Sequence, residues 1–145
     1  FAKSQLGASI ELPIKGQVFI SIKDDDKKNI IPVAQKLFKL GFKICATSGT
    51  AKILNDNEIE TNYIKKVIEG RPNAVDAMLS GEIQLVINTV EGSNSIKDSF
   101  SLRQTALLNK IPYYTTLQGA NAATLAIKVI KEEVLTVKSI QSYFE

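Results

Sequence analysis

Four short polar segments of the sequence carry side chains that could bind a charged ligand. The clearest is the run TSGT at 47–50, in which three hydroxyl side chains surround a glycine directly after an apolar stretch. Residues 23–27, 88–93 and 115–119 add lysine, amide and further hydroxyl groups. Phosphate groups are bound by such a set: backbone N–H groups at a helix N-terminus, short hydroxyl donors and a cation. The segments therefore indicate a phosphate-binding crevice.

The TSGT run itself admits two interpretations. Gly49 lets the backbone approach a ligand closely, and a helix that starts after Thr50 would point its positive end at the same place. Alternatively, the run is a strand-to-helix turn in which Thr47 or Ser48 caps the helix. The sequence alone leaves both interpretations open.

The charged residues near these segments also have plainer interpretations. Lys27 could be a solvated lysine, and the pair at 65–66 could be solvated unless the crevice reaches it. The acidic run at 24–26 could hold Mg²⁺, although acidic residues that open a helix are commoner. Cys45 lies within an apolar stretch and is predicted to be a buried small hydrophobe.

The composition restricts the chemistry further. The chain has 145 residues, no histidine and one cysteine, which excludes Cys/His zinc sites, histidine-based catalysis and an internal disulfide. The lone cysteine suits the cytosol. The net charge of +3 is too small for a dedicated nucleic-acid binder. The longest uncharged stretch, 111–127, contains proline, glycine and amides, so neither a membrane span nor a membrane partner is expected.

Apolar runs and helical patterns alternate along the chain and would position these segments. Residues 1–15 are predicted to be a hinge or linker, and residues 16–145 a single domain. The alternation predicts a three-layer α/β/α fold with a mainly parallel five-stranded sheet, whose strand ends carry the polar segments. We expect strands at 18–22, 42–47, 62–64, 83–88 and 111–115, and helices at 30–38, 51–55, 72–79, 99–108 and 120–131.

Several longer segments resemble a known family. They are FAKSQLGA at the start, GFKICATSGTAKIL around the TSGT run, KVIEGRP at 66–72, LVINT at 85–89 and DSFSLRQTALLNKIPYYTTL at 98–117. In order and with few gaps, they are similar to the C-terminal domains of carbamoyl-phosphate synthase large chains, which belong to the methylglyoxal-synthase-like superfamily. The resemblance covers essentially the whole chain and implies a parallel five-stranded α/β fold. FAKSQLGA resembles the end of the preceding synthetic half, which implies that the chain is part of a longer protein.

The resemblance implies an allosteric function. Family members of the bacterial type bind UMP as an inhibitor and IMP as an activator at overlapping sites, while ornithine activates at the junction with the synthetic domain. The nucleotide-site positions of the family correspond here to Ser21, Lys27, Thr47, Thr50, Lys66 and Asn88. With the resemblance added, these residues are expected to surround one phosphate.

Two positions depart from the family pattern. Val90 stands where the family has a threonine, so a lost hydroxyl donor predicts weaker UMP binding. Tyr114 stands where an acidic residue helps to hold ornithine, and only Thr115 is retained at that second effector site. Ornithine is therefore expected to act weakly or not at all.

The resemblance also implies partners outside the chain. The domain itself would need no cofactor, whereas the parent enzyme would use ATP with Mg and K. The expected partners are the remainder of the large chain and the glutaminase small chain. The expected setting is cytoplasmic carbamoyl phosphate synthesis for pyrimidines and arginine.

Two other functions compete with regulation. One is a lyase of the methylglyoxal-synthase type, which converts dihydroxyacetone phosphate and needs a base and an electrophile. That family enzyme uses aspartate and histidine, whereas this chain has no histidine and offers Asp76 as its candidate base. The other is an interaction domain with an empty crevice or a different effector.

Overall fold

The fold is an all-parallel five-stranded sheet. The computed structural model describes residues 12–66, 70–89 and 93–144. Its strands pair in the order β3-β2-β1-β4-β5, every pair is parallel, and the order confirms the predicted α/β class. The strands are β1 (Gln17–Ser21), β2 (Lys43–Ala46), β3 (Thr61–Tyr63), β4 (Leu85–Asn88) and β5 (Tyr113–Tyr114).

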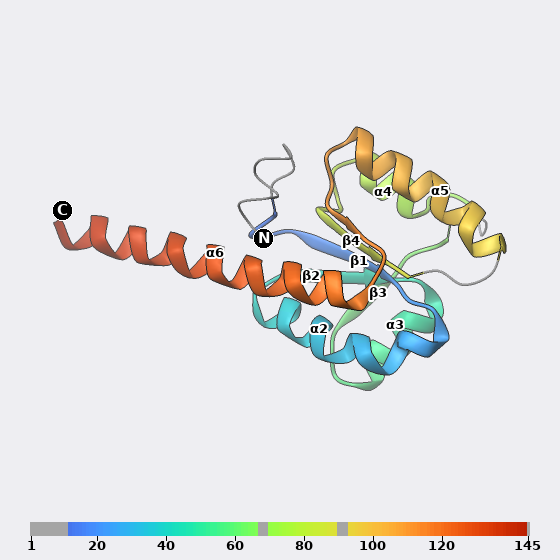
Figure 1. Ribbon diagram of the computed structural model, residues 1–145, viewed down its shortest axis with the longest axis horizontal. Coiled ribbons are helices and arrows are strands. Elements are labelled where there is room, and N and C mark those ends of the chain that lie inside the picture. Colours follow the sequence, from blue (N-terminus) through green and yellow to red (C-terminus); the bar gives the residue numbers. More distant parts are fainter. Residues whose placement is uncertain (1–11, 67–69, 90–92, 145) are drawn as a thin grey trace.

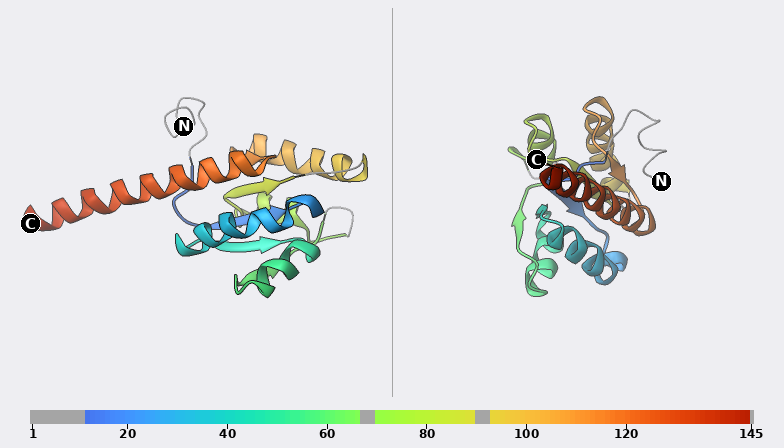
Figure 2. Two further views of the ribbon diagram at one scale, coloured as in Figure 1. Left: turned by 60° about the horizontal axis from the view of Figure 1, so that its bottom comes forward. Right: turned by 90° about the vertical axis from the view of Figure 1, so that its left-hand side faces the viewer.

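Helices cover both faces of this sheet and complete the three layers (Figure 1). One face carries α2 (Lys27–Lys39), α3 (Ser48–Asp56) and α6 (Leu117–Phe144), and the other carries α4 (Ala74–Leu79) and α5 (Ser93–Leu108). A short 3₁₀ helix, η1 (Asp24–Asp26), leads from β1 into α2. Figure 2 shows the sheet and its helices in two further views, with the end of α6 projecting beyond the body.

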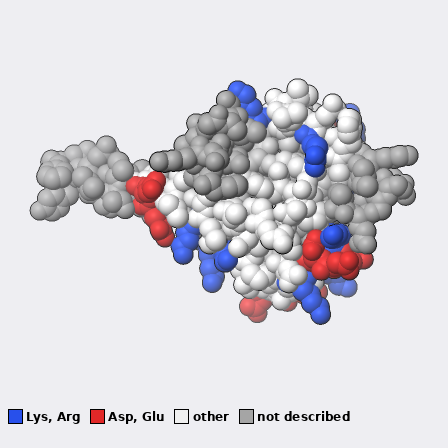
Figure 3. Space-filling view, in the orientation of Figure 1, with Lys and Arg blue, Asp and Glu red and all other residues white. Residues whose placement is uncertain are grey.

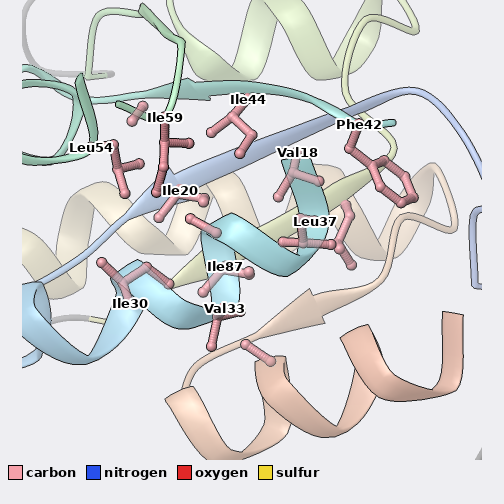
Figure 4. Close-up of a cluster of buried hydrophobic side chains, with 14 of the residues drawn as sticks. Val18, Ile20, Ile30, Val33, Leu37, Phe42, Ile44, Leu54, Ile59 and Ile87 are labelled. Carbon is pink, nitrogen blue, oxygen red and sulfur yellow. The ribbon is translucent and has the colours of Figure 1, made fainter. Parts of the chain in front are cut away.

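Two buried clusters hold the layers together. The larger one joins β1, β2 and β4 to α2, α3 and α6 through aliphatic side chains such as Ile20, Leu37 and Ile87 (Figure 4). The smaller one lies under α4 and α5 and includes Phe19, which is 1% exposed. Burial of this apolar surface on both faces explains why the three central strands, β1, β2 and β4, consist mainly of hydrophobic residues.

Strand alternation decides where the polar strand ends point. Phe19, Cys45 and Val86 belong to the cluster under α4 and α5, so their side chains face that side of the sheet. Side chains alternate along a strand, and a position two residues further on faces the same way. The side chains of Ser21, Thr47 and Asn88, each two residues after one of these, therefore emerge together on that face.

Several element boundaries differ from the sequence predictions. The last helix, expected at 120–131, begins at Leu117 and runs to Phe144. It starts earlier because the Thr116 hydroxyl accepts a hydrogen bond from the Gly119 N–H, and no glycine or proline follows Gly119 to end it. The fifth strand, expected over 111–115, is shortened to the two residues of β5.

Some predictions fall on residues outside the described ranges. The FAKSQLGA segment, most of the predicted linker, Val90 and residues 67–69 of the KVIEGRP segment belong to this group. Within the described ranges, no helix combines the length and the apolar character that crossing a bilayer requires.

Candidate functional site

The carboxyl ends of β1 and β2 meet at a pair of hydroxyl groups. The Thr47 hydroxyl donates to Ser21 Oγ at 3.4 Å; Ser21 ends β1, and Thr47 directly follows the neighbouring strand β2. Thr47 precedes α3 in extended conformation and makes no side-chain hydrogen bond to the first turn of that helix. The Thr47 side chain therefore does not cap α3, as the second interpretation of the TSGT run proposed. The N–H groups in the first turn of α3 receive no hydrogen bond from the Thr47 hydroxyl.

Lys27 lies over the start of α3. A Cβ placed on Gly49 would come within 2.9 Å of Lys27 Nζ, so the absence of a side chain at Gly49 leaves room for the ammonium group. The Lys27 side chain is only 27% exposed, which is unlike the fully solvated lysine of the plainer interpretation. A cation and the positive end of a nine-residue helix therefore point at one place, an arrangement that favours an anion.

Thr50 has a structural contact. It is 1% exposed, and its Oγ1 accepts a hydrogen bond from the Ile22 N–H at 3.2 Å. This bond ties the first turn of α3 to the end of β1, so Thr50 positions the hydroxyls of Ser21 and Thr47 relative to the helix.

Lys66 follows β3 and extends the positive charge of the site. Its side chain is exposed, and its charge contributes to lowering the pKa of Asp24. The main cause of that lowering is the hydrogen bond and charge of Lys27, whose Nζ lies 2.6 Å from Asp24 Oδ1. Lys27, Lys66 and Asp24 therefore lie within electrostatic range of one another.

The acidic run at 24–26 pairs with lysines. Asp24 pairs with Lys27, and Asp26 lies 3.9 Å from the Lys23 ammonium group. Among the described residues, no group of three or more potential metal ligands comes together. Figure 3 shows acidic side chains beside basic ones at the end of the molecule where η1 leads into α2. An anionic ligand at Lys27 would have to compete with Asp24.

This competition gives a testable expectation. We expect Asp24→Asn to tighten the binding of a phosphate monoester at Lys27 by up to about fivefold, because it releases the Lys27 ammonium from an ion pair with an exposed carboxylate. Isothermal titration calorimetry at fixed ionic strength measures the change. Asp25→Asn is the matched control, since it removes the same charge from an exposed neighbour. Equal effects of the two substitutions would contradict a specific competition at Lys27.

Asn88 lies beside Ser21 in the sheet but is bonded away from it. The two residues are register partners on β1 and β4. The Asn88 amide nitrogen donates to Ser99 Oγ at 2.8 Å and to the Tyr113 hydroxyl at 2.7 Å. Ser99 and Tyr113 were not among the predicted site residues, and no local motif could have indicated them, because α5 and β5 meet β4 only in the folded chain.

Thr89 belongs to the polar segment at 88–93 that was expected at the crevice, but it was not among the predicted site residues. It is 5% exposed, its Oγ1 accepts from the Lys23 N–H at 2.9 Å, and its own N–H donates to the Ser21 carbonyl. These bonds join the end of β4 to the end of β1 and fix Ser21 and the start of η1. The feature of the sequence that could have identified Thr89 is the polar segment at 88–93.

Thr115 belongs to a different opening. It lines a cleft of about 470 Å³ between the start of α2 and the start of α6, together with Lys23, Asp26, Asn29 and Gln118. The adjacent Tyr114 is half-buried, and this burial raises the pKa of its hydroxyl. Thr115, the residue predicted for a second effector site, therefore lines a cleft together with other polar side chains.

Two further residues named in the sequence analysis, the predicted buried Cys45 and the candidate base Asp76, can also be placed. Cys45 is 3% exposed, as expected, and its burial raises its pKa to about 12, so the thiol is protonated at neutral pH. Asp76 accepts hydrogen bonds from Arg71 and from the Asn73 N–H, and these contacts lower the pKa of its carboxyl. It forms a capping box with Asn73 at the start of α4.

Comparison with known proteins gives consistent results. A family model described as MGS-like domain matches residues 29–115. The carbamoyl phosphate synthase large chain of Rhizobium meliloti (strain 1021) is 51% identical over 145 residues, which is 100% of this chain and 12% of that protein. The C-terminal section of the same large chain from Methanopyrus kandleri is 45% identical over 139 residues, 95% of this chain and 26% of that protein. The chain thus spans about an eighth of the first relative.

Solved structures agree on the fold. Methylglyoxal synthase from Elizabethkingia anophelis NUHP1 superposes with a TM-score of 0.62 at 16% identity, over 78% of this chain and 79% of that chain. ForH superposes with a TM-score of 0.55 at 17% identity, over 86% of this chain and 94% of that chain. At such low identity these likenesses concern the fold and not the chemistry.

Proposed function

The chain belongs to the MGS-like domain family and is homologous to the C-terminal, MGS-like part of carbamoyl phosphate synthase large chains, and from this premise we propose that it is a regulatory domain that binds nucleoside monophosphates. UMP would act as inhibitor and IMP as activator of an ATP-dependent ligase. The domain would have no chemistry of its own.

One observation supports this proposal above all others. The Lys27 ammonium group lies over Gly49 at the start of α3, and Thr47, whose hydroxyl is linked to that of Ser21, comes two residues before Gly49. A cation, a helix N-terminus and short hydroxyl donors are the groups that bind a phosphate monoester. These groups lie at the carboxyl edge of the parallel sheet, and this edge is where ligands of α/β folds bind.

The remaining partners belong to the same proposal. The domain would act on the remainder of the large chain, and the parent enzyme would bind ATP, Mg and K and receive ammonia from a glutaminase small chain in the cytoplasm. Its product would serve pyrimidine and arginine synthesis. By thermodynamic linkage, an inhibitor must bind more tightly to the less active arrangement of the parent. Ornithine, if it binds, would use the cleft at Thr115.

A binding titration of the purified chain tests the proposal. We expect saturable binding of UMP and IMP, with much weaker binding of N-acetylglutamate and dihydroxyacetone phosphate. Saturable binding of neither nucleotide would contradict the proposal, and tight binding of N-acetylglutamate alone would indicate a different effector.

Asp76, the candidate base for the competing lyase function, is poorly suited to that role. Asp76 is held by Arg71 and the Asn73 N–H, and its lowered pKa makes it a weaker base than an ordinary aspartate. The chain contains no histidine to polarise the substrate carbonyl.

We therefore expect no methylglyoxal from dihydroxyacetone phosphate above the uncatalysed rate. A coupled assay with glyoxalase measures the product. Turnover by the chain that disappears in Asp76→Asn would overturn this expectation.

A further inference from the structure

The connection from β3 to α4 carries Lys66 and leaves the sheet beside the TSGT run. The Ile64 N–H donates to the Ala46 carbonyl at 2.9 Å, so the chain at the end of β3 stays bonded to the end of β2. Thr47 directly follows Ala46, and Lys66 comes two residues after Ile64. The place of Lys66 at the crevice therefore depends on what holds the connection after Ile64.

Hydrogen bonds tie this connection to the start of α4. The Ala74 N–H donates to the Lys65 carbonyl at 3.2 Å, and the Asn73 amide nitrogen donates to the Gly70 carbonyl at 3.0 Å. The first of these bonds holds the residue directly before Lys66 against the first turn of α4. The position of Lys66 is therefore linked to the position of that turn.

The Asp76 carboxylate holds the residues that lead into α4. It accepts from the Asn73 N–H at 2.9 Å, and from Nη2 and Nε of Arg71 at 2.7 and 3.1 Å. The Asn73 side chain accepts in return from the N–H groups of Val75 and Asp76. An arginine that donates twice to one carboxylate fixes the orientation of the pair as well as its distance. One carboxylate thus fixes residues 71–73 against α4.

We propose that Asp76 is a positioning residue of the phosphate site, which holds residues 71–73 against α4 and thereby keeps Lys66 beside the bound phosphate. This inference rests on the proposed function, because it takes a phosphate monoester as the ligand. Lys66 contributes to the lowered pKa of Asp24, the ion-pair partner of Lys27, so its charge acts at the phosphate-binding groups. Asp76 would act on the ligand only through Lys66.

The sign of the charge change separates this role from a purely electrostatic one. Asp76→Asn removes a negative charge, which through the field alone would tighten the binding of an anion. If Asp76 acts by positioning Lys66, the same substitution loosens residues 71–73 and weakens the binding of the anion instead. Arg71→Gln breaks the same pair from its other side and should also weaken binding.

Titration calorimetry of the full chain with UMP, and with inorganic phosphate as a second probe, tests the inference. Lys66→Ala should weaken UMP binding by about fivefold, the upper range for an exposed charge pair, and Asp76→Asn by about two- to fivefold. Adding Asp76→Asn to Lys66→Ala should cause no further loss. Adding it to Lys27→Ala should cause its full loss, because Lys27 is placed by α2. A general loosening of the fold would weaken binding equally on both backgrounds.

Glu82→Gln is the matched control. It also removes one negative charge, from an exposed residue that follows α4, and the Glu82 carboxylate accepts from the Ser80 hydroxyl. Because Glu82 has no hydrogen bond to residues 71–73 in the described part of the chain, UMP binding should change less than about twofold.

Unchanged or tighter UMP binding by Asp76→Asn, or a loss that persists in full on the Lys66→Ala background, would overturn this inference alone. Circular dichroism checks that each variant is folded. Where Asp76→Asn does not fold, Arg71→Gln carries the same comparison with Lys66→Ala, because the Arg71 side chain is 80% exposed. An unmodified chain that binds neither UMP nor inorganic phosphate would overturn the proposed function together with this inference.

Discussion

Replacing Lys27 by alanine is expected to weaken UMP binding by about 10- to 150-fold. This range corresponds to about 1.5–3 kcal/mol, the contribution of a hydrogen bond to a charged group. The loss should be this large because the Lys27 side chain is only 27% exposed and lies over Gly49, where it reinforces the positive end of α3. Isothermal titration calorimetry with UMP measures the affinity.

Lys28→Ala provides the control for charge alone. Lys28 is the exposed neighbour of Lys27 on α2, and its removal lowers the net charge by the same amount. UMP binding should change less than threefold, because exposed charges are screened by salt. An equal loss in the two variants would mean that Lys27 acts through the overall field and not at the phosphate.

The largest effect on stability is expected from Phe19→Ala. Phe19 is 1% exposed and joins the central strand to the cluster under α4 and α5. Removing its ring loses buried apolar area and leaves a cavity, which should lower the free energy of unfolding by about 3–5 kcal/mol. Urea denaturation followed by circular dichroism measures the shift of the midpoint.

Phe38→Ala is the matched control for this substitution. Phe38 lies on α2 and is 42% exposed, so less contact is lost and no closed cavity forms. Its cost should be well under half that of Phe19→Ala. A comparable loss of stability in the two variants would contradict the assignment of Phe19 to the core.

The strands and their order along the chain could be predicted from the sequence, because their apolar runs are short and bounded by glycine or polar turns. The sheet order β3-β2-β1-β4-β5 could not, since it depends on crossovers that leave no local pattern. The helical spacing of apolar residues was a less reliable guide to which side chains are buried. Phe100 and Leu107, apolar positions of the predicted helix at 99–108, are exposed, whereas Leu102 and Ala106 are buried as the period requires.

The polar residues of the candidate site could be predicted from the sequence, but their hydrogen-bond partners could not. The rule that ligands bind at the carboxyl ends of parallel strands indicated the polar segments, and the family resemblance selected Lys27 and the hydroxyl residues from them. The structure adds that Thr50 is bonded to the Ile22 N–H and that Asn88 is bonded to Ser99 and Tyr113. Those partners lie far away along the chain, so no spacing in the sequence could indicate them.

The central claim is that a nucleotide phosphate binds at the start of α3, between Lys27 and the linked hydroxyls of Thr47 and Ser21. An amide NMR titration of the isotopically labelled chain with UMP, inorganic phosphate and uridine tests it most directly. The account predicts that UMP and phosphate both shift the amide signals of residues 48–50 and that uridine does not. Shifts that are confined to the cleft at residues 115–118, or that uridine reproduces at residues 48–50, would contradict it.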